Sequence, residues 1–570
     1  MAPRFITRWY YAILISLLTP VASSMYTRAD GLAQLNATLE GRLQKALPLA
    51  APCFEDTNGA ACVSVREGLN SSWVRTSQYS GFRFMQGEAC VSDHHNQCLL
   101  DSITLEPQGE TCEQGILSPH YIEIKRASDA KAIFKYARQF GDRLSIKNSG
   151  VDYFSRSSLQ GSLAIWTRGL RHSSFSKSFV PEGCPAGTKP VPAITFGAGI
   201  SSDEAYTIAH GYGVTHFGGT VNAIGASGGW LLNGGHGIMS GTRGLGADRV
   251  LQFTVVTPDG KIRIANKCSN RDLFWALRGA GGGAFGVIID STHPTEPEKP
   301  LTAATMSFSG TTKSQRSFTG IMAENMRQWA LQGWGGPSSP NFSVLVNDKV
   351  SVVEAKKTLA PALDFVTAQN GTVNVRSYEN FYQFYVEVMN GTFATPLTAS
   401  SAVFTTTRIV PEHHFLDVRA RERMVDAIMD TQAAGLPTSF LTTMPLVYGR
   451  KNREPNTSLH PAWYKSVWIV ASAVQWTANS SIEERESAVS MLKNATATWK
   501  ELIPNGCTYA NEADPWDNDW AFESWGDNYN RLLKIKARVD PDNLLTCRHC
   551  VGWDESLPGY ECMSALDMPS

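Results

Sequence analysis

A glycine-rich stretch between residues 218 and 246 constrains the fold more than any other part of the chain. It contains eleven glycines, in the sequence GGTVNAIGASGGWLLNGGHGIMSGTRGLG. Glycine loses the most conformational freedom on folding, so such a density is retained where backbone bends sharply or approaches a ligand closely. The stretch has neither the GxGxxG spacing after a strand nor a P-loop lysine. Two interpretations stay open: backbone N–H groups around an extended ligand such as a pyrophosphate, or tight turns in a β-rich domain.

The segments around this stretch predict α/β units. Ser128 and Asp129 predict a helix that ends at Gly141, and Ser201 predicts the start of a second helix. Two strand–helix–strand units would then end in loops rich in small residues, and such loops commonly converge on one ligand. The predicted strands are residues 121–126, 144–147, 163–167 and 194–199.

The remaining chain predicts further domains. A hairpin is expected around Pro258–Gly260, and a proline-rich boundary follows at residues 294–300. Residues 301–500 mix predicted strands and helices, which indicates an α+β domain. A length of 570 residues exceeds what one hydrophobic core supports, so we expect two or three domains.

The N-terminus is typical of a secretory signal. Arg4 and Arg8 precede an apolar run at residues 10–18, and small residues follow at 20–24. The run is too short to span a bilayer comfortably, although an uncleaved anchor is the alternative. Eight N-x-S/T sequons agree with secretory passage and predict glycosylation at Asn36, Asn70, Asn341, Asn370, Asn390, Asn456, Asn479 and Asn494.

The 11 cysteines predict disulfides with one thiol left over. Five of them lie between Cys53 and Cys112, in a segment that we expect to be irregular. Cys547-x-x-Cys550 could indicate zinc or redox chemistry, but no second CxxC or HxxxH accompanies it. A structural disulfide is therefore the favoured interpretation, and no metal is expected.

With a net charge of −1, the chain lacks the excess of positive charge that is typical of proteins that bind nucleic acid or an acidic membrane. We expect a monomer without a membrane span after signal cleavage. The extracellular space, the cell wall and the vacuolar lumen all stay open as final locations.

Several segments together resemble one family. The matching residues are IKNSGVDYFSRSS (146–158), ITFGAG (194–199), the first part of the glycine-rich stretch (218–237), GLGADRVLQFTVVTPDG (244–260), DLFWALRGAGGGAFGVI (272–288) and WGDNYNRLLKIKARVDPDNL (525–544). In this order they resemble the fungal berberine-bridge-enzyme-like branch of the vanillyl-alcohol-oxidase family, which has a PCMH-type FAD-binding domain. The implied fold class is α+β, with a two-part FAD-binding domain and an α+β substrate domain whose sheet is backed by helices.

The resemblance implies a division of the chain and a cofactor site. The expected parts are a signal peptide (1–24), a Cys-containing extension (25–115), the FAD-binding domain (116–296), the substrate domain (297–507) and a returning C-terminal segment (508–570). The residues implied at FAD are Lys147, Asn148, Ser149, Gly150, Val151, Asp152, Tyr153, Ser157, Gly218, Gly219, Thr220, Gly225, Ser227, Gly228, Gly229, Gly234, Gly235, His236, Gly286, Val287, Asn528 and Tyr529.

Two departures from the family pattern concern covalent attachment of the flavin. The family's usual histidine tether corresponds to Val151, and its cysteine tether to Val221. Neither valine can form the bond, so we expect non-covalent FAD, a weaker oxidant and easier cofactor loss. His236 is a possible substitute tether, although a loop histidine bonded to backbone is the favoured interpretation.

The family reaction implies hydride transfer from a small organic molecule to flavin, with O2 as acceptor and a side-chain base. The expected base-carrying strand, residues 468–476, has no Tyr, Glu or Asp, so the base stays unassigned. Weak candidates are Tyr382, Tyr385, Tyr464 and Gln475.

Three functions stay open. The first is oxidation of an alcohol or a secondary-metabolite intermediate. The second is non-redox isomerisation or cyclisation on the same fold, and the third is a non-catalytic binding or escort role. We favour the first because the residues matching the cofactor loops are retained.

Overall fold

The structure is a computed structural model. It describes residues 27–90, 97–390, 397–452, 456–556, 559–560, 562 and 566. The predicted signal peptide lies outside these residues.

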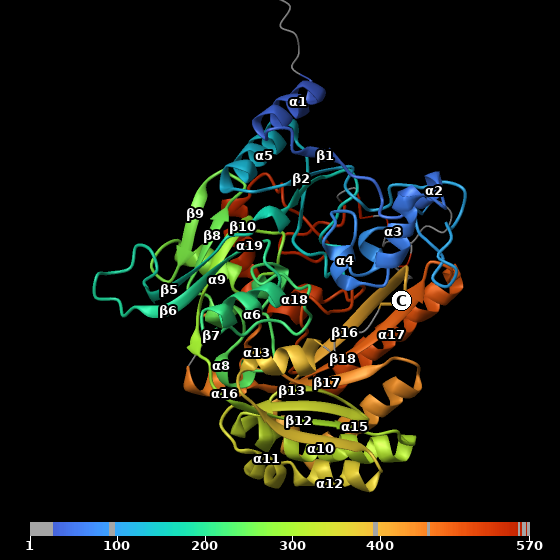
Figure 1. Ribbon diagram of the computed structural model, residues 1–570, viewed down its shortest axis with the longest axis vertical. Helices are drawn as coiled ribbons and strands as arrows, with labels where there is room; N and C mark the ends of the chain where they lie inside the picture. The colour runs from blue at the N-terminus through green and yellow to red at the C-terminus, as the bar shows by residue number, and fades with distance from the viewer. Residues whose placement is uncertain are drawn as a thin grey trace, which may run out of the picture.

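A small parallel unit opens the upper part of the molecule in Figure 1. Its four-stranded sheet has the order β1-β2-β4-β3, in which β2, β4 and β3 run parallel. The bounds are β1 (Leu43–Lys45), β2 (His120–Glu123), β3 (Leu144–Lys147) and β4 (Leu163–Trp166). Helix α5 (Ala127–Phe140) crosses between β2 and β3 and buries Ile133, Phe134 and Ala137.

The predicted start of α5 needs correction. The helix begins at Ala127, two or three residues earlier than a cap at Ser128 or Asp129 would place it. Asp129 instead lies inside the first turn, where its carboxylate accepts hydrogen bonds from the backbone N–H of Lys125 and Arg126. Asp129 is therefore the third residue of the helix, and its contact with the backbone N–H at the helix start is the one that the acidic residue of a capping box makes.

A second, antiparallel sheet follows in the order β5-β6-β10-β8-β9. Its N-capped helix α6 (Ser202–Gly211) begins as predicted, because the Ser201 hydroxyl accepts from the Glu204 N–H. The predicted hairpin at Pro258–Gly260 joins β8 to β9. The bounds are β5 (Ser173–Phe179), β6 (Val191–Gly197), β7 (Val214–Thr215), β8 (Gln252–Val256), β9 (Ile262–Asn266), β10 (Val287–Pro294), β11 (Glu296–Pro297), α7 (Gly229–Leu232), α8 (Ser240–Arg243) and α9 (Arg271–Leu277).

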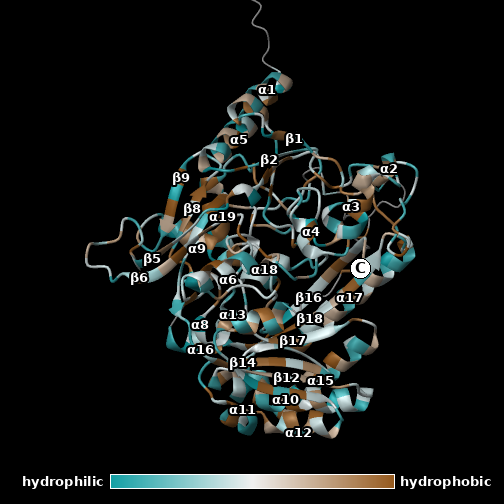
Figure 2. Cartoon of the chain, in the orientation of Figure 1, coloured by the Kyte–Doolittle hydropathy of each residue, from teal (hydrophilic) through white to brown (hydrophobic). Residues whose placement is uncertain are grey.

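The lower part is built on a seven-stranded antiparallel sheet in the order β15-β12-β14-β13-β17-β18-β16. Long helices cover its outer face, and Figure 2 shows apolar strands such as β14 above helices whose outer turns are hydrophilic. The strands are β12 (Leu301–Ser307), β13 (Gly336–Ser339), β14 (Phe342–Asn347), β15 (Thr372–Tyr378), β16 (Ser401–Pro411), β17 (Thr438–Thr442) and β18 (Ser466–Thr477). The helices are α10 (Thr312–Gln332), α11 (Val352–Thr358), α12 (Ala360–Ala368), α13 (Phe381–Phe384), α15 (Val418–Ala433), α16 (Leu446–Lys451) and α17 (Ile482–Leu502).

The expectation that the N-terminal extension is irregular holds for the described residues from 77 to 115, which contain one short 3-10 turn, but it is wrong for the first part of the extension. It forms short helices that pack through buried leucines and cysteines, including Leu35, Leu69, Cys53 and Cys62. Their bounds are α1 (Arg28–Thr38), α2 (Ala51–Glu55), α3 (Ala60–Gly68) and α4 (Ser72–Thr76). Frequent glycines and polar residues hid these helices, because a short helix gives little periodic signal.

The cysteine prediction is confirmed. The structure pairs Cys53–Cys62, Cys90–Cys562, Cys98–Cys112, Cys184–Cys268 and Cys547–Cys550. Cys507 is the thiol left over, and it is buried. The CxxC pair is thus a disulfide in a loop.

The C-terminal segment returns to the upper part and fixes a glycine-rich turn there. The segment contains α18 (Trp520–Trp525) and α19 (Asn528–Val539). The Trp525 indole N–H donates to the Gly279 carbonyl at 2.8 Å, and the Lys536 Nζ donates to the Ala284 carbonyl at 2.9 Å. These two hydrogen bonds from the C-terminal helices therefore fix the position of residues 279–284.

Candidate functional site

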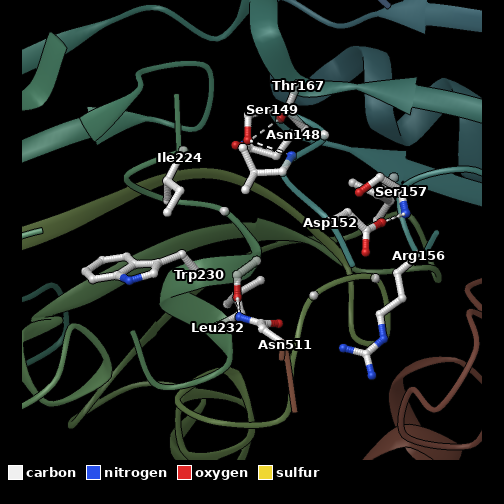
Figure 3. A pocket seen from close by; sticks show the side chains of 18 of the residues that line it. Asn148, Ser149, Asp152, Arg156, Ser157, Thr167, Ile224, Trp230, Leu232 and Asn511 are labelled. Carbon is white, nitrogen blue, oxygen red and sulfur yellow. Dashed lines mark hydrogen bonds between the residues drawn. The ribbon is translucent and has the colours of Figure 1, made fainter. Parts of the chain in front are cut away.

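Three loops and part of the C-terminal segment line a cavity that is partly open to solvent, in the upper part of the molecule (Figure 3). The loops are residues 148–153, 224–230 and 282–286, and the C-terminal segment contributes residues 509–512. The first loop follows β3, the second leads into α7, and the third precedes β10. Segments far apart in the sequence thus meet at one site, as the sequence predicts.

Asn148 ties the first two loops together. Its amide Nδ2 donates to the Thr167 hydroxyl at 2.9 Å and to the Ala198 carbonyl at 2.6 Å. A Cβ atom at Gly225 would lie 1.7 Å from the Asn148 Oδ1, and one at Gly228 would lie 2.6 Å from its Cγ. Both positions therefore require glycine so that the second loop can approach the first.

Gly229 is glycine for a different reason. A Cβ atom there would meet no atom within 4 Å, and the residue lines the cavity. A side chain at this position would therefore occupy part of the cavity. A bare backbone that faces an open volume at the start of a helical turn suits an extended, phosphate-bearing group.

One cation faces the cavity. Arg156 donates from Nε to the Arg548 carbonyl and from a terminal nitrogen to the Ala510 carbonyl. Burial lowers the pKa of Arg156 to about 10, so the guanidinium stays protonated at neutral pH. Among the described residues no carboxylate forms an ion pair with it, which leaves its charge for an anionic ligand. Asp152 is instead occupied by the backbone N–H groups of Phe154 and Ser157.

The structure divides the residues implied at FAD into three groups. Twelve line the first cavity: Asn148, Ser149, Gly150, Val151, Asp152, Tyr153, Ser157, Gly225, Ser227, Gly228, Gly229 and Gly286. Thr220 and His236 line an adjoining cavity. Of the described residues, eight line neither of these cavities: Lys147, Gly218, Gly219, Gly234, Gly235, Val287, Asn528 and Tyr529.

Lys147, Asn528 and Tyr529 have other partners. The Lys147 Nζ is fully buried and donates to the carbonyls of Gln78, Tyr79 and Gly81, so it organises the N-terminal extension. The Asn528 amide donates to the Leu459 carbonyl at 2.8 Å. Tyr529 stacks on Trp525 with ring centroids 5.6 Å apart. The placement of these three side chains gives no support to cofactor contact.

The other glycines of the stretch make tight turns. A Cβ atom at Gly235 would lie 3.0 Å from the Trp230 ring, and one at Gly237 would lie 2.6 Å from the Gly218 carbonyl oxygen. Both initial interpretations therefore apply, to different parts of the stretch. Residues 225–229 face a cavity, whereas residues 234–246 fold back on Trp230.

A second cavity, also partly open to solvent, lies between this site and the seven-stranded sheet. Strands β13, β16, β17 and β18 form one wall, and the glycine-rich stretch contributes Val221 and His236 to the other. Four residues line both cavities: Tyr153, Ile224, Trp230 and Glu512. The two cavities therefore adjoin, and ligands in them would lie against each other.

Three buried polar atoms at the second cavity have no hydrogen-bond partner among the described residues. They are the Nδ1 of His236 and the hydroxyl oxygens of Thr405 and Thr443. Thr443 is 1% exposed and Thr405 is 8% exposed. An unpaired buried polar group is costly, so these atoms point to a ligand with hydrogen-bonding groups.

The four catalytic candidates line neither cavity, and this part of the prediction is not supported. The Tyr385 hydroxyl donates to Asp203 at 2.8 Å, and the Tyr464 hydroxyl donates to Asp248 at 2.7 Å. The Tyr382 ring stacks on His210, with centroids 4.3 Å apart. Gln475 is exposed, because the alternation of β18 turns it to solvent.

Sequence reasoning missed the most distinctive polar residues of the site. Arg156, Trp230, Tyr509 and Asn511 line the first cavity, and Glu512 lines both. The Asn511 amide donates to the Tyr509 hydroxyl at 2.8 Å and to the Gly229 carbonyl at 3.3 Å. The only sequence signal was the run Tyr-x-Asn-Glu at residues 509–512, in a segment without regular structure.

Comparison with known proteins agrees with this architecture. Residues 119–266 match the family described as FAD binding domain, and residues 508–552 match the family described as berberine and berberine like. FAD-linked oxidoreductase OXR2 of Pyricularia oryzae is 38% identical over 557 residues, which cover 94% of this chain and 94% of that protein. The chain belongs to the berberine-bridge-enzyme-like, vanillyl-alcohol-oxidase-type FAD-linked oxidoreductases. FAD-linked oxidoreductase cheF of Chaetomium globosum is also 38% identical, over 97% of this chain and 91% of that protein.

Solved structures agree with the assignment to these oxidoreductases. The VAO-type flavoprotein MtVAO615 of Myceliophthora thermophila superposes with a TM-score of 0.80 at 25% identity, over 93% of this chain and 96% of that chain. A glucooligosaccharide oxidase of Acremonium strictum shares the fold, with a TM-score of 0.62 at 20% identity over 76% of this chain and 91% of that chain. The predicted family, fold class and enzyme class are confirmed.

Two further features concern the described residues alone. None of their helices is both long and apolar enough to cross a membrane. No group of three or more His, Cys, Asp or Glu side chains among them could hold a metal ion.

Proposed function

We propose that this oxidoreductase binds FAD non-covalently in the first cavity and oxidises a small organic molecule in the second. The substrate would be an alcohol or a secondary-metabolite intermediate. The observation that carries the proposal is the shared wall of the two cavities, formed by Tyr153, Ile224, Trp230 and Glu512. FAD, when bound, supplies a hydride acceptor, and the protein supplies binding and orientation.

The residues of the first cavity fit the cofactor. The glycine backbone of residues 225–229 would approach the pyrophosphate, and Arg156 would face its negative charge. Of the described residues that line either cavity, His236 is the only histidine and none is a cysteine. This composition supports non-covalent binding, with Val151 and Val221 at the family's tether positions.

An anaerobic mixing experiment tests the oxidase proposal. A panel of primary and secondary alcohols is mixed with the FAD-loaded protein without oxygen, and the flavin absorbance is recorded. We expect at least one alcohol to bleach the flavin and O2 to restore the colour. A panel in which no alcohol bleaches a fully loaded flavin would count against oxidation of this substrate class.

Glu512 is the group that we propose as proton acceptor, with His236 beside it. Among the described carboxylates it is the only one that lines both cavities, and its Oε1 lies 3.9 Å from the His236 Nε2. Glu512→Gln should slow flavin bleaching by about 10²–10⁴-fold, the usual contribution of a general base, while FAD content stays unchanged. Equal bleaching rates in the variant and the parent protein would exclude this role.

We also propose passage through the secretory pathway, a monomeric state and O2 as the electron acceptor. The disulfides support the first of these, because they form in oxidising compartments. Of the eight sequon asparagines, Asn70, Asn370, Asn456, Asn479 and Asn494 are exposed, while Asn36, Asn341 and Asn390 are half-buried. Enzymatic deglycosylation of protein from a eukaryotic host should increase gel mobility by several glycans, and an unchanged mobility would argue against this route.

A relative named for a different activity favours a second candidate. The bifunctional decalin synthase calF of Penicillium decumbens is 26% identical over 91% of this chain and 90% of that protein. Non-redox cyclisation in the second cavity is therefore the alternative proposal. Turnover of a substrate without oxygen and without flavin bleaching would favour it.

A further inference from the structure

The second cavity carries one acidic side chain and no basic one that is always charged. Of the described residues that line it, Glu512 is the only carboxylic acid, and neither lysine nor arginine is present. The other lining residues are mostly apolar or hydroxyl-bearing, such as Ile224, Leu441 and Thr438. A negatively charged ligand would therefore meet a carboxylate in an apolar setting without a compensating cation, which is unfavourable.

Glu512 is held at the entrance from one cavity to the other. Its backbone N–H donates to the Tyr509 carbonyl at 2.8 Å, which closes a turn, and its side chain is 27% exposed. Burial raises the pKa of Tyr509, and the negative charge of Glu512 adds to that increase. The neighbouring phenol is thus kept protonated.

Hydrogen-bonding capacity in the second cavity lies on both of its walls. The Nδ1 of His236 belongs to the glycine-rich stretch, the Thr405 hydroxyl to β16 and the Thr443 hydroxyl to the end of β17. Each of these atoms is buried without a partner in the part of the chain that the structure describes. They would pair with the polar groups of a ligand whose remaining surface is apolar.

We propose that the second cavity selects a neutral or cationic, largely apolar substrate whose hydroxyl or amine group donates a hydrogen bond to Glu512, and that it rejects anions. The inference rests on the proposed function and names the substrate class for the same site. A charge-assisted hydrogen bond from an ammonium group is stronger than one from a neutral hydroxyl. The expected order of affinity is therefore amine, alcohol, carboxylate.

A matched series of three probes tests this order. Benzylamine, benzyl alcohol and benzoate share a ring and one substituent carbon but differ in charge. Their binding to the FAD-loaded protein is measured by isothermal titration calorimetry at neutral pH and millimolar probe concentrations. We expect benzylamine to bind at least about tenfold more tightly than benzoate, with benzyl alcohol between them.

Two variants assign the effect to one carboxylate. In Glu512→Gln the difference between benzylamine and benzoate should fall below about threefold, while benzyl alcohol binding changes little. Glu501→Gln, at an exposed position on α17, should keep the parent order. Benzoate binding as tight as benzylamine, a preference that survives in Glu512→Gln, or no binding of benzylamine and benzyl alcohol would each overturn the proposal.

The outcome is separable from that of the proposed function. The FAD content of each sample is measured first, from its visible spectrum. A protein that takes up no FAD would contradict the proposed function, whereas the calorimetric order of the three probes would still report on the second cavity.

Discussion

Gly229→Val protein is expected to bind FAD at least about tenfold more weakly than the parent protein, equivalent to roughly 1.4 kcal/mol of binding free energy or more. The new side chain would enter a volume in which no atom lies within 4 Å of the Cβ position. That volume belongs to the first cavity, so the valine competes with the cofactor for space. The measurement is the dissociation constant for FAD, from quenching of flavin fluorescence on titration into apoprotein.

The same substitution at Gly187 is the control. Gly187 lies in the exposed loop between β5 and β6, and a Cβ atom there also meets nothing within 4 Å. Both variants should unfold within about 0.5 kcal/mol of the parent apoprotein, because neither displaces packed atoms. Unchanged FAD affinity in Gly229→Val would show that the loop at residues 225–229 does not face the cofactor.

Val151→His protein is expected to hold most of its flavin covalently, whereas the parent protein holds none. Val151 lines the first cavity on the loop after β3, at the position that carries the histidine tether in the proteins that this chain resembles. An imidazole there would be aimed at the cofactor from the same loop. Flavin fluorescence of the denatured polypeptide in a gel measures the bond.

Two further variants test whether a residue other than the new histidine forms the covalent bond to the flavin. Val151→Ala should release all of its flavin on denaturation, because alanine offers no nucleophile. Val151→His combined with His236→Ala should still retain flavin, which separates the new tether from the natural histidine of the second cavity. Retention that disappears only with His236→Ala would move the tether to that residue.

The first cavity could be predicted largely from sequence, because local backbone chemistry marks it. The glycines at 225, 228 and 229 are there for close approach, either to Asn148 or to open cavity space, and glycine density reports this need directly. The loop at residues 148–153 follows a strand that alternation identified. Both signals lie within short stretches of chain.

The second cavity could not be predicted, because its residues carry no local signature. Its wall consists of Ser, Thr, Ala and Pro side chains from strands as far apart as β13 and β18. Only the register of the seven-stranded sheet brings them together. Short strands such as β13, whose sequence is GPSS, resemble turns in composition.

The catalytic candidates suggested by the sequence lie outside both cavities for a related reason. Tyrosines in a substrate domain are natural candidates for a catalytic base. The hydroxyls of Tyr385 and Tyr464 instead donate hydrogen bonds to the carboxylates of Asp203 and Asp248. Glu512 lies instead in an irregular segment, where neither periodicity nor capping singles out a residue. Its importance depends on a tertiary contact with His236 across 276 positions of sequence, the difference between 512 and 236.

The central claim is that this oxidoreductase binds FAD in the first cavity without a covalent bond. The most direct test is a visible spectrum of the purified protein, followed by acid precipitation and a second spectrum of the supernatant. We predict a yellow protein that releases all of its flavin into the supernatant. Flavin retained in the pellet, or a colourless protein that added FAD does not restore, would contradict the account.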